Sequence, residues 1–147
     1  LEARARELEL GDRVRFDGFV SSEELARRFA ECDAFVLPAV VDSKGDTEGL
    51  GVVLVEALSY GKPAIASAAG GIVDIVRDGE TGLLVPPADA DALATAIAEL
   101  AEDRTRAREL GAGGREYVER EFSWPVIIDR LMALYDDVVR RASRATT

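Results

Sequence analysis

Short apolar runs alternate with helical patterns in the middle of the chain. Three almost wholly apolar runs, Asp33–Pro38, Pro63–Ser67 and Thr81–Val85, predict strands of a parallel sheet, because such strands are covered on both faces. Between the first two, Leu50–Tyr60 has the pattern of a buried helix, and Gly61 follows where glycine commonly closes a helix. This alternation predicts an α/β fold in which helices flank a parallel sheet.

The region before these strands carries two further signals. Period-two alternation of polar and apolar residues at Arg13–Asp17 predicts another strand. Ser21, followed three residues later by Glu24, forms the capping box that begins many helices. The alternation of strand and helix therefore extends towards the N-terminus.

The region after the strands is helical. The final helices are expected at about residues 104–141, and Gly111, Gly113 and Gly114 mark a weak point within them. Ser123 is placed to cap the last helix, whose apolar residues recur at helical spacing.

Composition and charge narrow the function classes. A chain of 147 residues is one domain or part of one. Its net charge of −10 argues against broad nucleic-acid binding, which needs a basic surface. Cys32 is the only cysteine, so no internal disulfide can form, and a cytoplasmic setting fits. The sequence has no histidine, which excludes a histidine-assisted nucleophile and histidine-ligated zinc within this chain.

The loop after the strand Asp33–Pro38 carries the candidate chemistry. Ligands of parallel sheets bind beyond the carboxyl ends of the strands, and this loop delivers Glu48 and Gly49–Gly51 to the start of a helix. Glycines let a ligand approach the backbone, and the unpaired N–H groups of a helix start attract phosphate. Glu56 lies ~12 Å further on if the segment is helical throughout. Two carboxylates at that separation suit two hydroxyl-bearing groups joined by a diphosphate.

From the residues alone, both a ligand-binding and a purely structural interpretation of the two carboxylates stay open. Glu48 could simply complement the helix dipole, and Glu56 should face either a cleft or solvent, because burying an isolated carboxylate is costly. A glycosidase needs its two carboxylates ~5–9.5 Å apart, which is closer than this spacing.

No G-x-G-x-x-G follows a first strand, as a nicotinamide dehydrogenase would require. Lys62 fits an exposed turn better than a Schiff base to pyridoxal phosphate.

Glu48 and Glu56, with seven residues between them, resemble the E-x7-E motif of retaining GT-B glycosyltransferases, especially glycosyltransferase family 4. Other segments follow the pattern of that family in the same order over roughly residues 11–139. These segments are Val14–Val20, Asp33–Pro38, Gly61–Pro63, Gly70–Val76, Asp78–Pro87 and Phe122–Trp124. The resemblance implies the Rossmann-like C-terminal domain of a GT-B fold, which binds a nucleotide-diphosphate sugar.

The resemblance also implies roles for the two carboxylates. Glu56 would accept hydrogen bonds from the ribose hydroxyls of the donor, and Glu48 would contact hydroxyls of the transferred sugar as the catalytic carboxylate. The intact enzyme would be a hexosyltransferase that transfers the sugar with retention, in the cytoplasm or associated with a membrane.

The remaining donor contacts would come from the backbone. N–H groups of Gly49, Leu50 and Gly51 would hold the diphosphate or the sugar, and backbone near Phe19 and Val20 would flank the base. A UDP-, GDP- or ADP-sugar would be the substrate, and neither a metal nor another cofactor is expected.

Several parts of the family pattern are not found in this sequence. They are the Arg and Lys that neutralise the diphosphate, the first two strands of the domain and the whole N-terminal acceptor domain. Residues 1–147 are therefore interpreted as part of a C-terminal donor-binding domain. The family strand order 3-2-1-4-5-6 would leave a gap between the strand at Val14 and the strand at Phe35. The alternative function is a non-catalytic nucleotide-binding or association module, with self-association or swapping of elements.

The missing parts lead to a prediction for the chain by itself. Because the acceptor domain and the diphosphate cations are not found in it, we expect no transferase activity from the isolated chain. Donor turnover can be followed by release of the nucleoside diphosphate, and steady turnover would contradict the interpretation of the chain as a partial domain.

Overall fold

A three-stranded parallel sheet, in the order β1-β2-β3, organises the computed structural model, which describes residues 1–40 and 49–145. The strands are β1 (Phe35–Leu37), β2 (Ala64–Ser67) and β3 (Gly82–Val85). The helical elements are α1 (Glu2–Glu7), the 3-10 turn η1 (Gly11–Arg13), α2 (Ser22–Glu31), α3 (Val52–Ser59), α4 (Ile72–Ile75), α5 (Ala90–Glu102), α6 (Arg104–Glu121) and α7 (Trp124–Ala145). The predicted α/β fold and its three apolar strands are confirmed.

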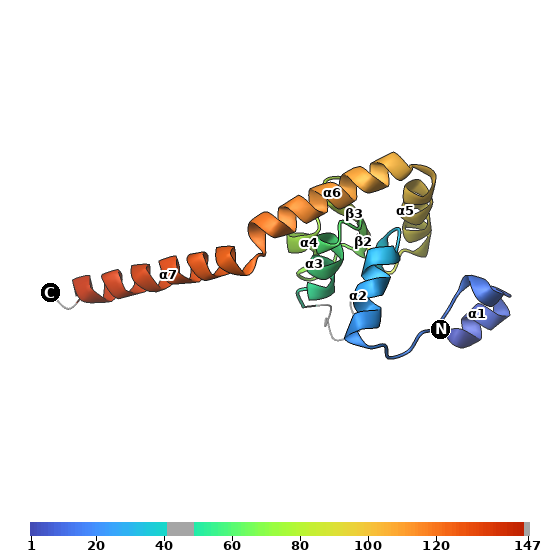
Figure 1. Cartoon of the computed structure of the whole chain (residues 1–147), viewed down its shortest axis with the longest axis horizontal. Coiled ribbons are helices and arrows are strands. Elements are labelled where there is room, and N and C mark those ends of the chain that lie inside the picture. Colours follow the sequence, from blue (N-terminus) through green and yellow to red (C-terminus); the bar gives the residue numbers. More distant parts are fainter. Residues whose placement is uncertain (41–48, 146–147) are drawn as a thin grey trace.

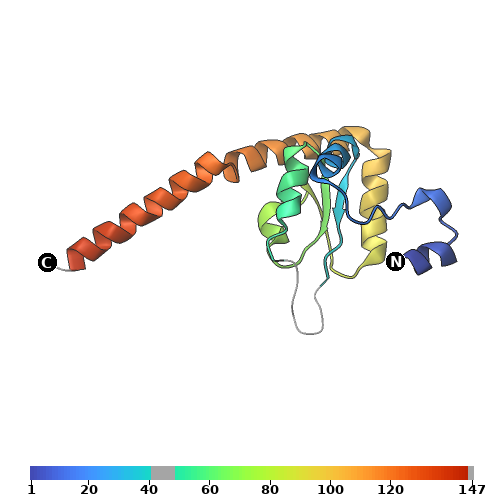
Figure 2. The same ribbon diagram turned by 60° about the horizontal axis from the view of Figure 1, so that its bottom comes forward.

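The core lies on both faces of β2, all four residues of which are buried. Ala64 and Ala66 face a cluster formed with α3 and α4, whereas Ile65 faces a second cluster formed with α5. α6 contributes to both clusters, through Val118 in the first and Leu110 in the second. Figure 2 shows the strands lying between α3 and α4 on one side and α5 on the other. Two-sided burial explains why the strands are apolar without alternation.

α6 lies directly against the turn between α3 and β2. A Cβ atom on Gly111 would lie 2.1 Å from the carbonyl oxygen of Gly61, and one on Gly114 would lie 2.5 Å from Cδ2 of Leu58. Both glycines are buried within a helix that runs unbroken from end to end. The helix is therefore unbroken at the predicted weak point, because the glycines allow close packing that compensates for their poor helix propensity.

Residues 1–20 form an arm that stands apart from the sheet (Figures 1 and 2). The strand predicted at Arg13–Asp17 is wrong, because this segment joins no strand in the part of the chain that the structure describes. Alternation alone cannot make a strand, since the backbone also needs a neighbour to pair with. Val14 and Phe16 consequently remain 39% and 44% exposed. Arg28 of α2 contacts Asp17 at 3.5 Å and ties the arm to the helix that follows.

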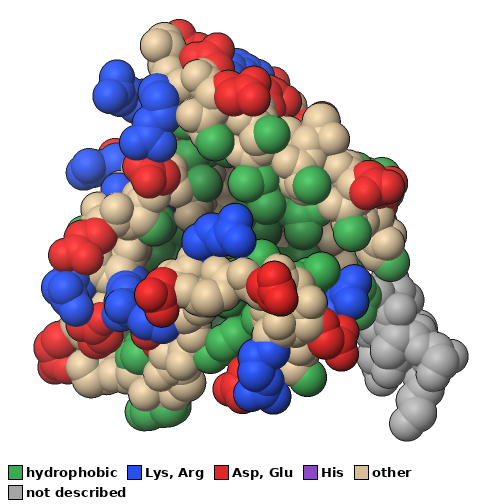
Figure 3. Space-filling view, turned by 90° about the vertical axis from the view of Figure 1, so that its right-hand side faces the viewer, with side chains coloured by type: hydrophobic (Ala, Val, Ile, Leu, Met, Phe, Trp, Pro, Cys, Tyr) green, Lys and Arg blue, Asp and Glu red, His purple; other side chains and the backbone are tan. Residues whose placement is uncertain are grey.

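The side of the molecule on which α1 and α5 lie is hollowed, because the arm of residues 1–20 stands apart from the sheet (Figures 1 and 3). Figure 3 views that side and shows hydrophobic side chains in a hollow, with charged side chains around it. The two clusters around β2 contain no residue of the arm.

α7 extends away from the sheet at the opposite side of the molecule from α5 (Figure 1). Together with α6 it accounts for the helices expected at about 104–141. At its start Arg130 donates hydrogen bonds to the backbone oxygen and the carboxylate of Glu121. Apolar side chains at helical spacing are exposed along α7: Trp124, Ile127, Ile128, Leu131, Leu134, Tyr135 and Val138. Among the described residues, no helix combines the length and the apolar character needed to cross a membrane.

The close packing of α6 generates a test. We expect Gly111→Val to lower the free energy of unfolding by about 3 kcal/mol, because the new side chain meets backbone that cannot move away cheaply. Ala112→Val is the matched control, since Ala112 is the exposed neighbour in the same helix. Urea denaturation of both variants measures the difference, and equal stabilities would contradict the packing described.

Candidate functional site

The start of α3 is shaped by Gly51. Gly51 is the N-cap of α3 with φ 70° and ψ 44°, a left-handed conformation that glycine adopts without strain. It is buried, and a Cβ atom there would lie 3.1 Å from Cδ1 of Leu54 and 3.7 Å from Cδ2 of Leu37. Leu37 ends β1, so the helix begins beside the carboxyl end of that strand. This is the placement predicted for a ligand site in a parallel sheet.

Among the described residues, no side chain caps the start of α3, and the first turn of the helix has no acidic residue. With respect to these residues, the first N–H groups of α3 are available to a ligand. Gly49 and Leu50 precede it as an exposed bend. A Cβ atom on Gly49 would meet no described atom within 4 Å, so the backbone is open to close approach. Unpaired N–H groups at the positive end of a helix form a site for phosphate. Glu48, the other carboxylate predicted for this site, lies outside the described residues.

Glu56 is exposed and faces a depression between α2 and α3. The depression measures about 280 Å³ and is lined by Ser22, Leu25, Ala26, Phe29, Glu56, Ser59 and Tyr60. No hydrogen bond or ion pair joins the Glu56 carboxylate to another of the described residues. The expectation that Glu56 faces a cleft or solvent is confirmed, and its oxygens are available as acceptors.

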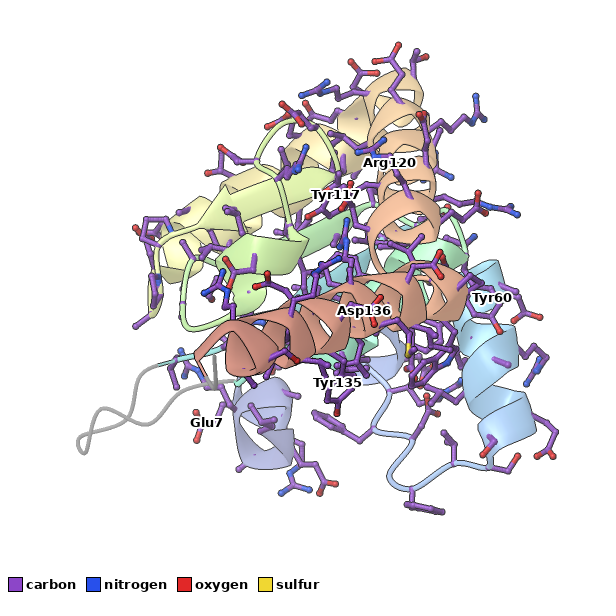
Figure 4. The ribbon with its side chains drawn as sticks, turned by 90° about the vertical axis from the view of Figure 1, so that its left-hand side faces the viewer. Glu7, Tyr60, Tyr117, Arg120, Tyr135 and Asp136 are labelled. Carbon is purple, nitrogen blue, oxygen red and sulfur yellow. The ribbon has the colours of Figure 1, made fainter. Side chains whose placement is uncertain are left out.

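The walls of this depression are built by aromatic packing. The rings of Phe29 and Tyr60 stack with their centroids 5.6 Å apart and their planes at 20°. Figure 4 shows Tyr60 beside α2, which brings the two helices together here. Ser22 and Ser59 line the same depression as Glu56, and the Ser59 hydroxyl donates to the backbone oxygen of Glu56 at 2.6 Å. An apolar wall with hydroxyls and one acceptor carboxylate suits a flat, hydroxyl-bearing ligand such as a nucleoside.

The helix start and the Glu56 depression lie on the same helix. Glu56 follows Gly51 by five residues, which is ~7.5 Å along a helix axis. A ligand with a phosphate at one end and sugar hydroxyls at the other could therefore contact both. Ser22 could not be predicted as part of this site, because it reaches the site only through the packing of α2 against α3. Tyr60 follows Glu56 by four residues at the end of α3, a spacing that places both on one face of the helix.

Phe19 and Val20 lie at the end of the arm, just before α2. Ser21 caps that helix by accepting a hydrogen bond from the Glu24 N–H at 3.2 Å, so the predicted capping role of Ser21 is confirmed. Phe19 is fully exposed and Val20 is half-buried. Neither lines the depression at Glu56, although Ser22, two residues after Val20, does. Their role beside a base stays a prediction.

Cations near the site are engaged elsewhere. Arg27 and Arg28 both bind the Glu24 carboxylate at 2.6 Å, and hydrogen bonds from Arg27 and then Arg28 lower the pKa of Glu24. Lys62 and Arg104 line a different depression, next to Asp33 at the amino ends of the strands. The described residues therefore offer backbone donors and acceptor oxygens at the site, but no cation lines the depression at Glu56.

Two other kinds of chemistry find no support in the geometry. No group of three or more His, Cys, Asp or Glu side chains among the described residues could hold a metal ion. Burial raises the pKa of the Cys32 thiol, which also donates to the Phe29 backbone oxygen at 3.5 Å. A thiol with a raised pKa is a poor nucleophile at neutral pH.

Comparison with known proteins identifies the family. Residues 1–117 match the glycosyl transferases group 1 family. The chain belongs to this family. A GDP-mannose-dependent alpha-(1-6)-phosphatidylinositol monomannoside mannosyltransferase from Mycobacterium tuberculosis is 39% identical over 132 residues, which is 89% of this chain and 34% of the relative. The chain thus spans about a third of the length of such relatives.

Solved structures show the same fold within longer chains. Sucrose-phosphate synthase from Thermosynechococcus elongatus superposes with a TM-score of 0.80 at 40% identity, covering 95% of this chain and 34% of that one. The Anabaena protein HepE, solved in complex with UDP, superposes with a TM-score of 0.83 at 26% identity, covering 92% of this chain and 35% of that one. The sheet and helices described above are therefore the Rossmann-like part of a group 1 glycosyl transferase.

The two glycines before α3 should respond differently to the same substitution. We expect Gly51→Ala to lower the free energy of unfolding by about 1–2 kcal/mol, because alanine is strained in the left-handed region. Gly49→Ala should leave stability unchanged, since its Cβ atom would enter open space. Urea titrations of the two variants provide the comparison. Equal effects would show that the conformation of Gly51 is not what the helix start requires.

Proposed function

We propose that this chain is the donor-binding part of a hexosyltransferase that uses a nucleotide-diphosphate sugar. The observation that supports the proposal most strongly is the shared helix α3. The N–H groups that follow Gly51 at its start are not capped by any described side chain, and its first turns carry the Glu56 carboxylate beside an apolar depression. One ligand class, with a diphosphate next to a ribose, uses both features at once.

Each predicted residue has a place in this proposal. Glu56 accepts hydrogen bonds from the ribose hydroxyls, and backbone N–H groups of the segment Gly49–Gly51 hold the diphosphate or the sugar. Glu48 contacts hydroxyls of the transferred sugar, and backbone near Phe19 and Val20 flanks the base. As the glycosidic bond breaks, preorganised N–H donors stabilise the negative charge that develops on the departing diphosphate.

The intact enzyme is proposed to belong to glycosyltransferase family 4 and to transfer a hexose with retention, without a metal. The relatives support a nucleotide-sugar donor but divide over its base. The mycobacterial relative is named as GDP-mannose-dependent, whereas HepE was solved with UDP and also with UDP-glucose. A cytoplasmic location is proposed from the single cysteine, Cys32.

The alternative is a non-catalytic nucleotide-binding or association module. The exposed apolar side chains of α7 favour this reading, because a surface of that kind commonly contacts another protein surface. Affinity for a nucleoside diphosphate separates the donor-binding function from association alone.

Titration calorimetry with UDP, GDP and ADP tests the proposal. We expect one of them to bind, and Glu56→Ala to weaken that binding by about tenfold or more, since a hydrogen bond to a charged group contributes ~1.5–3 kcal/mol. Glu99→Ala is the matched control, because Glu99 is also an exposed carboxylate on a helix, in this case α5, away from the depression. If none of the three binds, the donor-binding function is overturned and a bare structural fragment is favoured. Equal losses in the two variants would remove Glu56 from the site.

A further inference from the structure

We propose that Gly71 is a positioning residue, which holds the Gly49–Leu50 backbone where it can bind the donor diphosphate. The inference rests on the proposed function and adds a residue that lies 20 positions after Gly51 in the sequence. It concerns only contacts between the two loops that leave β1 and β2 at their carboxyl ends.

A backbone contact joins the described parts of the two loops. The N–H of Gly71 donates a hydrogen bond to the carbonyl oxygen of Gly49 at 2.9 Å. A Cβ atom on Gly71 would lie 2.4 Å from that oxygen, 3.1 Å from Cα of Leu50 and 3.4 Å from the carbonyl carbon of Gly49. The hydrogen bond therefore fixes the position of the Gly49 peptide. No space is left for a side chain at Gly71.

Space, rather than conformation, makes glycine necessary here. Gly71 has φ −77° and ψ 0°, which any residue can adopt. The glycine is thus not explained by the turn that it occupies. It is explained by the loop that lies against it, which makes the contact specific to the segment before α3.

The Gly71 side of the contact is anchored in the core, whereas the Gly49 side is not. Gly71 caps α4, whose Ile72 and Ile75 are fully buried. The hydroxyl of Tyr117, labelled in Figure 4, donates to the backbone oxygen of Asp74 in α4 at 3.1 Å. Gly49 and Leu50 are exposed. A side chain at position 71 would therefore displace the exposed loop, by about 1 Å if ordinary contact distances are to be restored.

Such a displacement should affect only one end of the ligand. The Gly49–Gly51 backbone is proposed to contact the diphosphate, while Glu56 contacts the ribose from within α3. Displacing the loop should weaken binding of a nucleoside diphosphate and leave binding of the nucleoside as it was. A general loss of structure would weaken both.

The test compares Gly71→Ala with Gly113→Ala. A Cβ atom on Gly113 would also meet a carbonyl oxygen, that of Glu80 at 2.7 Å, but next to the amino end of β3 and so at the far end of the sheet. Calorimetry measures affinity for whichever of UDP or GDP binds the unaltered chain, and NMR titration measures affinity for the corresponding nucleoside. We expect Gly71→Ala to bind the diphosphate about tenfold to a hundredfold more weakly, with nucleoside affinity unchanged. Gly113→Ala should match the unaltered chain for both ligands.

Each outcome separates this inference from the function on which it rests. Diphosphate affinity unchanged in Gly71→Ala, or an equal loss for the nucleoside, overturns the positioning role and leaves the proposed function standing. An unaltered chain that binds no nucleoside diphosphate overturns both. If Gly71→Ala does not fold, hydrogen exchange of the Gly71 amide in the unaltered chain decides. Protection that increases with bound nucleotide supports the role, and exchange at the rate of an open loop overturns it.

Discussion

Backbone pairing of β2 with a parallel strand on each side determines where every part of the candidate site lies. Because β1, β2 and β3 run in the same direction, their carboxyl ends meet at one edge of the sheet. The loops that leave β1 and β2 therefore emerge side by side and hydrogen-bond to each other. The start of α3 inherits its position from β1, and α4 inherits its position from β2. Loss of the β1–β2 pairing would separate the two loops even if each helix remained folded.

The sequence predicts the elements that are buried on both faces and fails where tertiary packing decides. The runs at Phe35, Ala64 and Gly82 are apolar because two clusters cover the sheet, and apolar runs of that kind are readable without a structure. Gly61 is predicted to close the helix at Leu50–Tyr60, and it follows α3 in a left-handed conformation with φ 68°. The alternation at Arg13–Asp17 is as regular as that of a strand, yet a strand also needs a pairing partner that the sequence cannot display. The glycines of α6 indicate a weak helix when the sequence is read alone. The reason for them lies in another part of the chain, because the turn after α3 packs against them.

The candidate site divides in the same way. Gly51 and Glu56 could be predicted, because both belong to one helix and its start. Ser22 and Phe29 could not, because they belong to α2 and reach the site only through the packing of α2 against α3. Gly71 lies in the segment Gly70–Val76, which follows the family pattern, but the sequence of this segment does not show which residues Gly71 contacts. Its contact is visible only when the two loops are seen together.

The distribution of charge around Glu56 has a consequence for how the site should respond to salt. Arg27 and Arg28 are engaged by Glu24, and Lys62 and Arg104 lie at the amino ends of the strands, so within the described part of the chain an anionic ligand meets backbone dipoles rather than cations. The chain as a whole carries a net charge of −10 and repels such a ligand at long range. Backbone dipoles act at short range and are little screened, whereas long-range repulsion weakens as the Debye length falls to ~10 Å at 0.1 M salt. Association of a nucleoside diphosphate should therefore become faster as ionic strength rises, the reverse of the behaviour of a phosphate site built from lysine and arginine.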